Sequence, residues 1–390
     1  MLNGLRRKIR KMSPTMIVCM VILIVLGVLF VYSACSIRED QSLRVLYLHH
    51  AVMGILGLGA YFLAACYPYR AIFRWRWIFY ATTLGLLVLV LLIGSETMGA
   101  RRWLFGIQPS ELAKFAIILV LARLYGRPGA KRGVGAFLLT LAIVGAPCAL
   151  ILLQPDLGTA LVLFPTVFAM LFAAKVCPRV VWSCFLTGAL LVATLLSVIW
   201  YADRPNVPQE RRDRLIRATC LRPHQVRRLQ VFLFPDRDLH GSGYNRHQSE
   251  IAVGSGGFWG KGYLKGEQYS LGYLPPSIST NDFIFSVLAE EKGFAGSLLV
   301  LSLFLGLLVS GMGVAYRCQD DTGRLYCVGV MTLIFSHMFI NIAMTIGLMP
   351  ITGLPLPFIS YGRTFLFTAM VMLGIVQSVS VFGHEPEERF

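Results

Sequence analysis

The sequence predicts an all-α integral membrane protein with about ten transmembrane helices, and three observations support this fold class. Of its 390 residues, 56% are hydrophobic and only 14% are charged, whereas a soluble domain carries about 25% charged residues. Apolar runs long enough to cross about 30 Å of hydrocarbon recur along the chain. The Lys and Arg residues stand between these runs, which is where they ordinarily set the topology of a membrane protein.

Ten apolar runs are long enough to form membrane-spanning helices. We expect these helices near residues 15–34, 46–66, 77–94, 110–125, 134–153, 157–174, 180–201, 295–316, 324–347 and 363–383. The first run follows a basic cluster at residues 6–11, as in a signal peptide, but it is too long and no good small-residue cleavage site follows it. We therefore expect an uncleaved first span.

The stretch from Phe283 to Arg317 needs a separate interpretation. As one helix it would be about 52 Å long, which is too long for a single crossing. The polar residues 290–293, Glu-Glu-Lys-Gly, interrupt its apolar pattern. We expect a short interfacial helix at 282–291, then a break, and the eighth span from about residue 295.

The short connections alternate in charge along the chain. Every second connection is basic, and these connections share one side with the N-terminal cluster: Arg70, Arg74, Arg76, Arg127, Lys131, Arg132, Lys175, Arg179, Arg317 and Arg324. By the positive-inside rule this side is the cytoplasm, and an even number of spans places both termini there. We expect a multi-pass protein of the cytoplasmic (inner) membrane, with residues 1–390 forming a single polytopic domain.

The opposite, extracytoplasmic side receives the unusual connections. They comprise residues 99–110, 154–156 and 349–362, and a long extracytoplasmic loop at residues 203–282 between spans seven and eight. These four connections are rich in polar, Gly and Pro residues, whereas the cytoplasmic connections are short and basic. We therefore expect the function to lie on the outer face.

Composition also excludes some classes of protein. The net charge of +16 suggests nucleic acid, but the basic residues punctuate the spans instead of forming one soluble basic domain, so we expect no nucleic-acid partner. The nine cysteines are scattered without a Cys-x-x-Cys pair. This pattern argues against a disulfide framework and against a structural zinc site.

The fourth span opens with charged residues that have two interpretations. Ser110 is a plausible N-cap, and Glu111 in the first turn suits the helix dipole. Lys114 is unfavourable there, but it lies three residues from Glu111 and can pair with it, either as a structural ion pair or in function. Arg101 and Arg102 lie outside against the positive-inside trend, which favours an anionic partner; a lipid headgroup would satisfy them without catalysis.

The loop at 203–282 has a basic first half and a glycine-rich second half. Seven arginines between residues 211 and 228 form either a solvated amphipathic surface or a phosphate-binding surface. The second half contains Gln248 within residues 243–249, and Lys261 within a Gly-Lys-Gly sequence. Glycine-rich backbone can approach an anion closely, although flexible loops are glycine-rich too.

Asp282 is the acidic residue that we select first for chemistry. It stands between the long loop and an apolar helix, where partial desolvation would raise its pKa toward the range of a general base. The alternative is that it caps the helix, a role that Thr280 could also fill. Asp156, just before the sixth span, is best explained as an N-cap.

A proline-rich connection follows the ninth span. Three prolines within residues 350–357 forbid a continuous helix. Irregular backbone near the membrane is tolerated where it lines a cavity or is buried in protein. Ser360 and Tyr361 would then line a headgroup pocket or simply anchor the chain at the interface.

Taken together, these motifs resemble the SEDS family (shape, elongation, division and sporulation), and within it the RodA-like members more than the division paralogue FtsW. The resemblance covers nearly the whole chain, with the motifs in family order. They are Gly99-Ala-Arg-Arg-Trp, Gln108-Pro-Ser-Glu-Leu-Ala-Lys, Gln154-Pro-Asp-Leu-Gly-Thr, Ile251-Ala-Val-Gly-Ser-Gly-Gly with Gly260-Lys-Gly, Asn281-Asp-Phe-Ile-Phe with Ala289-Glu-Glu, and Gly353-Leu-Pro-Leu-Pro-Phe-Ile-Ser-Tyr-Gly.

The resemblance implies a peptidoglycan glycosyltransferase that polymerises lipid II at the outer face of the membrane during cell elongation and shape maintenance. Asp282 matches the family's essential aspartate. A divalent cation, Mg²⁺ or Mn²⁺, is the implied cofactor, and a class B penicillin-binding protein is the implied partner. The residues that we assign to substrate binding on this basis are Arg101, Arg102, Trp103, Glu111, Lys114, Gln248, Lys261, Ser360 and Tyr361, with Arg101, Arg102, Lys114 and Lys261 as the phosphate contacts.

The sequence departs from the family pattern at three places. Asn281 separates Thr280 from the aspartate, Pro276-Ser-Ile-Ser replaces a usual Glu-His, and Arg363-Thr364 replace a usual Gly-Ser. These changes put the details of substrate contact in doubt. Two other functions compete with the enzyme: a lipid II flippase, which should carry polar groups near the midplane, and a non-catalytic scaffold for a penicillin-binding protein.

Overall fold

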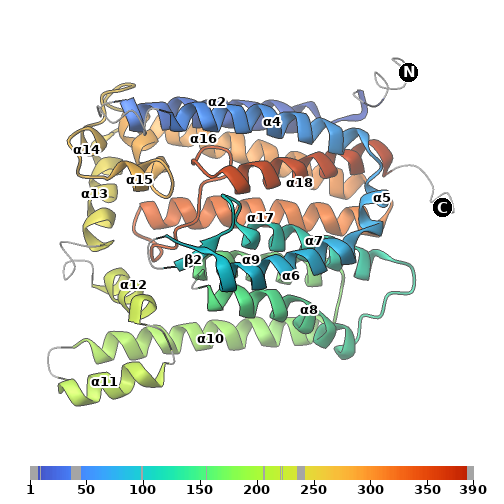
Figure 1. The fold of residues 1–390 in the computed structure, drawn as a ribbon, viewed down its shortest axis with the longest axis horizontal. Coiled ribbons are helices and arrows are strands. Elements are labelled where there is room, and N and C mark those ends of the chain that lie inside the picture. The colour runs from blue at the N-terminus through green and yellow to red at the C-terminus, as the bar shows by residue number, and fades with distance from the viewer. Residues whose placement is uncertain are drawn as a thin grey trace.

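The computed structural model is almost entirely helical, and its long helices lie side by side (Figure 1). It describes residues 8, 10–36, 45–97, 100–154, 156–204, 207–219, 221, 223–234 and 242–383. Among these residues, eight helices are long and apolar enough to cross a membrane. They are α2 (Pro14–Ser36), α4 (Leu46–Cys66), α6 (Arg76–Ile93), α8 (Val134–Leu153), α10 (Pro178–Ala202), α16 (Ile284–Arg317), α17 (Asp321–Thr345) and α18 (Arg363–Phe382).

The two remaining predicted spans also form helices. The helix α7 (Pro109–Gly126) carries three charged residues, Glu111, Lys114 and Arg123, and α9 (Leu157–Ala173) is apolar but only 17 residues long. Each of the ten predicted segments therefore coincides with a helix. The fold class of an all-α multi-pass membrane protein is confirmed.

The core of the bundle is formed by α17 and α18. In their most apolar windows, 72% of α17 and 78% of α18 are buried, against 6% of α10. The helix α17 contacts α7, α9 and α16, and α18 packs along α4. Figure 1 shows α10 at the margin of the bundle, with α11 (Gln209–Ala218) beside it. Polar side chains on α7 and α17 are therefore surrounded by protein.

The expected break between residue 291 and the eighth span is confirmed. Gly293 interrupts α16 with φ 63° and ψ −159°, a conformation that favours glycine. A Cβ at Gly293 would lie 2.4 Å from the backbone nitrogen of Gly260 and 2.6 Å from the carbonyl oxygen of Phe258, so no larger residue fits. The break separates a short outer segment, residues 284–292, from the long membrane span.

The loop between α10 and α16 is folded into short helices where the structure describes it. After α11 come α12 (Pro223–Leu233), α13 (Ser242–Ser255), α14 (Glu267–Ser270) and α15 (Pro276–Ser279). In Figure 1, α12 to α15 lie at the end of the bundle opposite to α5 (Tyr69–Arg74). A hairpin of β1 (Ser95–Thr97) and β2 (Ala100–Trp103) precedes α7.

Candidate active site

Asp282 lies in the loop that joins α15 to α16. The N-cap of α16 is Phe283, and its side chain makes no capping hydrogen bond, so neither Asp282 nor Thr280 occupies the N-cap position that we considered for them. The Asn341 amide of α17 donates to the carbonyl oxygens of Asp282 (2.9 Å) and Leu354 (2.7 Å), and so holds this loop against the proline-rich connection. The carboxylate of Asp282 is left available for chemistry.

The pKa of Asp282 is raised to about 6, chiefly because burial penalises the charged form. Arg228 on α12 and Arg102 on β2 act in the opposite direction, since their positive charges favour the carboxylate. The side chain is half-buried and therefore still open on one side. A carboxyl group with this pKa is mostly ionised at pH 7 and basic enough to accept a proton.

Arg228 and Arg102 bring two guanidinium groups to the neighbourhood of Asp282. Arg228 donates to the carbonyl oxygen of Thr352 at 3.4 Å, and Arg102 donates to that of Gln154 at 3.3 Å. Burial and the nearby charge of Arg102 lower the pKa of Arg228, whereas Asp282 and Asp156 raise it. Two planar cations beside a basic carboxylate suit a substrate that carries phosphate.

The proline-rich connection forms one wall of this site. The backbone N–H of Tyr361 donates to the carbonyl oxygen of Thr280 (2.9 Å), and the hydroxyl of Ser360 donates to that of Asn281 (2.6 Å). Ser360 is buried and also accepts the N–H of Leu356 at 2.7 Å. Its hydroxyl thus fixes the loop of Asp282; Tyr361 is half-buried.

Gly353 lies next to the carboxylate of Asp282. Its φ of 75° favours glycine, and a Cβ there would lie 3.5 Å from Oδ2 of Asp282. The wall of the site is thus backbone at this point. Two of the three departures from the family pattern fall around the same wall: Asn281 contributes its carbonyl oxygen to the Ser360 bond, and Thr364 accepts the N–H of Gln108 at 3.2 Å.

Asp156 is the N-cap of α9, as predicted. Its Oδ1 accepts the N–H of Thr159 at 3.2 Å. Its Oδ2 accepts bonds from Thr159 Oγ1 (2.9 Å), Gln108 Nε2 (3.1 Å) and Ser110 Oγ (3.2 Å). The predicted N-cap role of Ser110 is wrong: Gln108 takes that position because Pro109 occupies N1, where its missing N–H has no cost.

Glu111 and Lys114 form the predicted ion pair, with 2.7 Å between Oε2 and Nζ. Lys114 is fully buried, donates to Nε2 of His337 at 2.8 Å, and lies 4.9 Å from the ring centroid of Phe365. His337 stacks on that ring and, as an Nδ1 donor, lies 3.4 Å from the carbonyl oxygen of Pro355. The buried Lys114 is thus linked through His337 to the proline-rich connection.

The other predicted site residues lie in two places. Arg101 and Trp103 belong to β2, opposite Glu96 and Ser95; Trp103 is half-buried, and the side chain of Arg101 lies outside the described part of the structure. Gln248 is half-buried on α13.

Lys261 belongs to a separate cluster of charged residues. Its Nζ lies 2.9 Å from Glu290 Oε1 and 2.9 Å from Glu267 Oε2. Two carboxylates therefore offset the positive charge of Lys261, which we expected to bind phosphate.

Arg228 is the site residue that sequence reasoning did not select. The arginines between 211 and 228 are similar in sequence, and their abundance indicated a phosphate-binding surface without distinguishing its members. The structure separates them: Arg228 is half-buried, whereas its neighbour Arg227 is exposed. A half-buried arginine beside a basic carboxylate is the stronger candidate for a functional role.

The described side chains offer few ligands for the expected divalent cation. Among the described residues, no group of three or more His, Cys, Asp and Glu side chains could hold a metal ion. Mg²⁺ is often bound by only one or two carboxylates, with substrate phosphates completing its shell. The described residues therefore offer no all-protein cage.

Comparison with known proteins gives consistent matches over almost the whole chain. The family model described as "Cell cycle protein", which covers FtsW, RodA and SpoVE, matches residues 14–385. The peptidoglycan glycosyltransferase MrdB of Escherichia coli K12 is 33% identical over 375 residues, covering 94% of this chain and 93% of MrdB.

Solved structures match over similar lengths. A chain from a peptidoglycan synthase complex, solved to explain how polymerization and crosslinking are coordinated, is 29% identical with a TM-score of 0.73; the match covers 96% of this chain and 99% of that one. The rod shape determining protein RodA of Thermus thermophilus is 27% identical with a TM-score of 0.64, over 96% and 98% of the two chains.

Proposed function

Because this chain belongs to the SEDS family of cell cycle proteins that includes FtsW, RodA and SpoVE, we propose that it is a peptidoglycan glycosyltransferase. It polymerises lipid II into glycan strands during cell elongation and shape maintenance. The observation that carries the mechanism is the environment of Asp282, a half-buried carboxylate with a pKa of about 6 beside two arginines.

In the proposed reaction, the 4-hydroxyl of an incoming disaccharide attacks the anomeric carbon of the growing strand. The new glycosidic C–O bond forms as the C–O bond to the lipid diphosphate breaks, and the electron pair of that bond leaves with the diphosphate. Asp282 accepts the proton of the hydroxyl, a contribution typically worth 10²–10⁴-fold in rate. Arg228 and Arg102 stabilise the charge on the departing diphosphate.

The distribution of charge supports an enzyme over a flippase. A carrier needs polar groups near the midplane that are reachable from both sides. Asp282, Arg228 and Arg102 all come from loops or short elements at one end of the bundle, and the buried pair Glu111–Lys114 is closed off by protein. A scaffold would not need a carboxylate with a raised pKa.

We further propose a class B penicillin-binding protein as partner, since this chain resembles a member of a complex that couples polymerization to crosslinking. We propose Mg²⁺ or Mn²⁺ as cofactor, which the phosphates of lipid II would hold. The proposed location is the cytoplasmic membrane, with both termini in the cytoplasm. This orientation rests on the positive-inside rule.

The test is polymerisation of labelled lipid II by the purified protein with its penicillin-binding partner and a divalent cation, with products separated by size. We expect glycan strands from the wild type and from Asp321→Asn, an exposed carboxylate at the other end of the bundle. Asp282→Asn should make roughly 10³-fold less product, because it cannot accept the proton. Undiminished synthesis by folded, partner-bound Asp282→Asn would remove Asp282 from the mechanism.

A further inference from the structure

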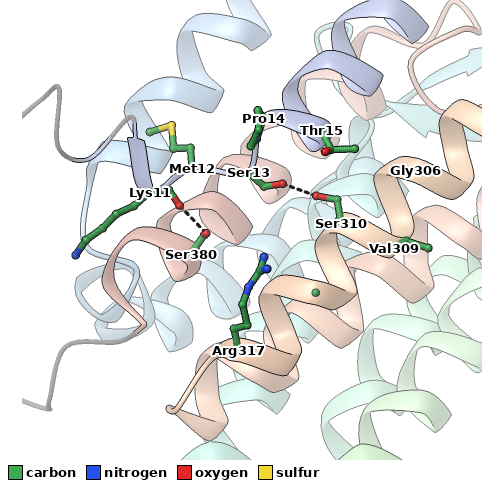
Figure 2. A pocket seen from close by; sticks show the side chains of 11 residues that line it. Lys11, Met12, Ser13, Pro14, Thr15, Gly306, Val309, Ser310, Arg317 and Ser380 are labelled. Atoms are coloured by element: carbon green, nitrogen blue, oxygen red, sulfur yellow. Dashed lines mark hydrogen bonds between the residues drawn. The ribbon is translucent and has the colours of Figure 1, made fainter.

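A cavity of about 810 Å³ lies far from Asp282, where α2 begins and α16 and α18 end (Figure 2). Its volume is within the range of small-molecule sites. The residues that line it are Lys11, Met12, Ser13, Pro14, Thr15, Gly306, Val309, Ser310, Gly313, Arg317 and Ser380. None of them takes part in the proposed reaction.

One face of α16 creates the cavity. Gly306, Ser310, Gly313 and Arg317 follow one another at intervals of four, three and four residues, so they share a side of the helix. The small residues leave space beside α2. Arg317 is the last residue of this row and places a guanidinium group at its end. Figure 2 shows the Arg317 side chain pointing toward the space between Ser380 and Ser310.

The start of α2 is held in place by hydrogen bonds to two other helices. The hydroxyls of Ser13 and Ser310 lie 2.5 Å apart, and Ser380 donates to the carbonyl oxygen of Lys11 at 2.9 Å. Gln377 of α18 binds Ser13 twice, accepting its N–H (3.0 Å) and donating to its carbonyl oxygen (2.9 Å). The cavity is therefore preformed, and a ligand would not have to order these segments.

The cavity is cationic at one end and apolar at its side. Arg317 is exposed and makes no ion pair within the described part of the chain, and the exposed Lys11 stands at the rim. Val309, which lines the cavity, is 62% exposed, and Val18 on the next turns of α2 is 54% exposed. Both valines lie on membrane-spanning helices and therefore face lipid.

We propose that this cavity binds the phosphate of an anionic phospholipid, with Arg317 and Lys11 at the headgroup and the acyl chains along Val309 and Val18. Paired cations at the ends of membrane helices are suited to anionic headgroups. The adjoining apolar surface favours an amphiphile over a free anion. The lipid belongs to the leaflet on the basic side of the protein, which is the inner leaflet in the proposed orientation.

The test is to titrate purified protein in detergent with phosphatidylglycerol. The melting temperature of the protein reports binding, since a bound ligand raises it. We compare the wild type with Lys11→Gln/Arg317→Gln. The matched control is Lys131→Gln/Arg179→Gln, which removes two exposed cations from other basic connections. At about fivefold per cation, the first double variant should bind roughly 25-fold more weakly, and the control should bind like the wild type.

A second variant tests the cavity separately from its charge. Gly313→Val fills it, and the nearest atom to the new Cβ, an Arg317 nitrogen at 3.7 Å, is at ordinary contact distance. We expect weaker lipid binding at an unchanged lipid-free melting temperature. Unaltered binding by this variant or by Lys11→Gln/Arg317→Gln would overturn the proposal.

The choice of probe distinguishes the lipid from other ligands. If phosphatidylcholine raised the melting temperature as much as phosphatidylglycerol does, the proposed selectivity for negative charge would be wrong. If inorganic phosphate raised it as much, the cavity would be a site for free anions. If no lipid raised the melting temperature of the wild type, the proposal would be overturned, and a protein partner would be the remaining occupant of the cavity. These readouts need no glycan synthesis, so they stand or fall independently of the proposed enzyme activity.

Discussion

Asp282 and Glu290 are two carboxylates near the N-terminal end of α16 with opposite surroundings. Glu290 is fully buried, and its carboxylate accepts bonds from Lys261 Nζ (2.9 Å) and from the backbone N–H groups of Glu267 (2.8 Å) and Gln268 (3.2 Å). Asp282 is half-buried, and within the described residues no donor reaches its carboxylate. Only the more distant charges of Arg228 and Arg102 act on it.

This difference separates a structural carboxylate from a reactive one. The hydrogen bonds to Glu290 occupy the carboxylate oxygens that a substrate hydroxyl would need. Glu290 therefore ties α14 and the Gly-Lys-Gly segment to the outer segment of α16. Asp282 has lost much of its hydration without gaining donors, so a substrate hydroxyl can supply the missing partner.

The largest expected effect comes from exchanging each carboxylate for its amide. Asp282→Asn should lower the turnover number roughly 10³-fold and raise the melting temperature at pH 7. The pKa of Asp282 is 3.8 in its unperturbed form and about 6 when folded, so the folded state loses stability as the pH rises from 3.8 to about 6, and the full loss persists at pH 7. Removing this charge should therefore stabilise the fold.

Glu290→Gln should have the opposite effects. It weakens three charge-assisted hydrogen bonds and leaves Lys261 with one carboxylate, at a cost of about 2 kcal/mol of stability. The measurements are melting temperature in detergent and strand synthesis from lipid II at a temperature where the variant is folded. Loss of activity by folded Glu290→Gln equal to that of Asp282→Asn would contradict the division of roles.

An intermediate effect is expected from the arginine beside Asp282. Arg228→Gln should lower kcat/KM roughly 10- to 100-fold, because it removes one charged contact to the leaving diphosphate. Arg214→Gln, an exposed arginine of α11, is the matched control and should have kinetics like the wild type. Steady-state rates over a range of lipid II concentrations measure this difference; equal kinetics for the two variants would assign Arg228 to packing alone.

The smallest expected effect is the dependence of rate on pH. A base with a pKa of about 6 is about 90% ionised at pH 7 and about 10% ionised at pH 5, so kcat/KM should fall about tenfold between these values. The residual activity of Asp282→Asn should be nearly level over the same interval. A wild-type rate that does not change between pH 5 and pH 7 would show that another group sets the basicity.

Sequence reasoning predicted the elements well because hydropathy is a local property. The ten spans, the break near Gly293 and the ion pair of Glu111 with Lys114 all depend on residues close together in the chain. The error at Ser110 is also local, because Pro109 favours the first helical position and so makes Gln108 the N-cap.

The partners of each charge were harder to predict because they depend on the path of the loop at 203–282. Arg228 approaches Asp282 across more than 50 residues of chain, and Lys261 meets Glu290 across 29. Nothing in a single sequence distinguishes Arg228 from Arg227. Nor does it distinguish a lysine that binds phosphate from a lysine that pairs with two glutamates. The tertiary fold makes these choices.

The break at Gly293 bears on how the protein tolerates membranes of different thickness. The backbone N–H groups of Lys261 and Gly262 donate to the carbonyl oxygens of Glu290 (3.0 Å) and Glu291 (3.0 Å), so the segment before the break is fastened to the loop at 257–262. The N–H groups of Phe294 and Ala295, just after the break, donate to the same loop. A span that meets a thinner or thicker bilayer adjusts by tilting. Because both sides of the break are bonded to the loop at 257–262, we expect such a tilt to be taken up beyond Ala295 and to leave the segment that follows Asp282 in place.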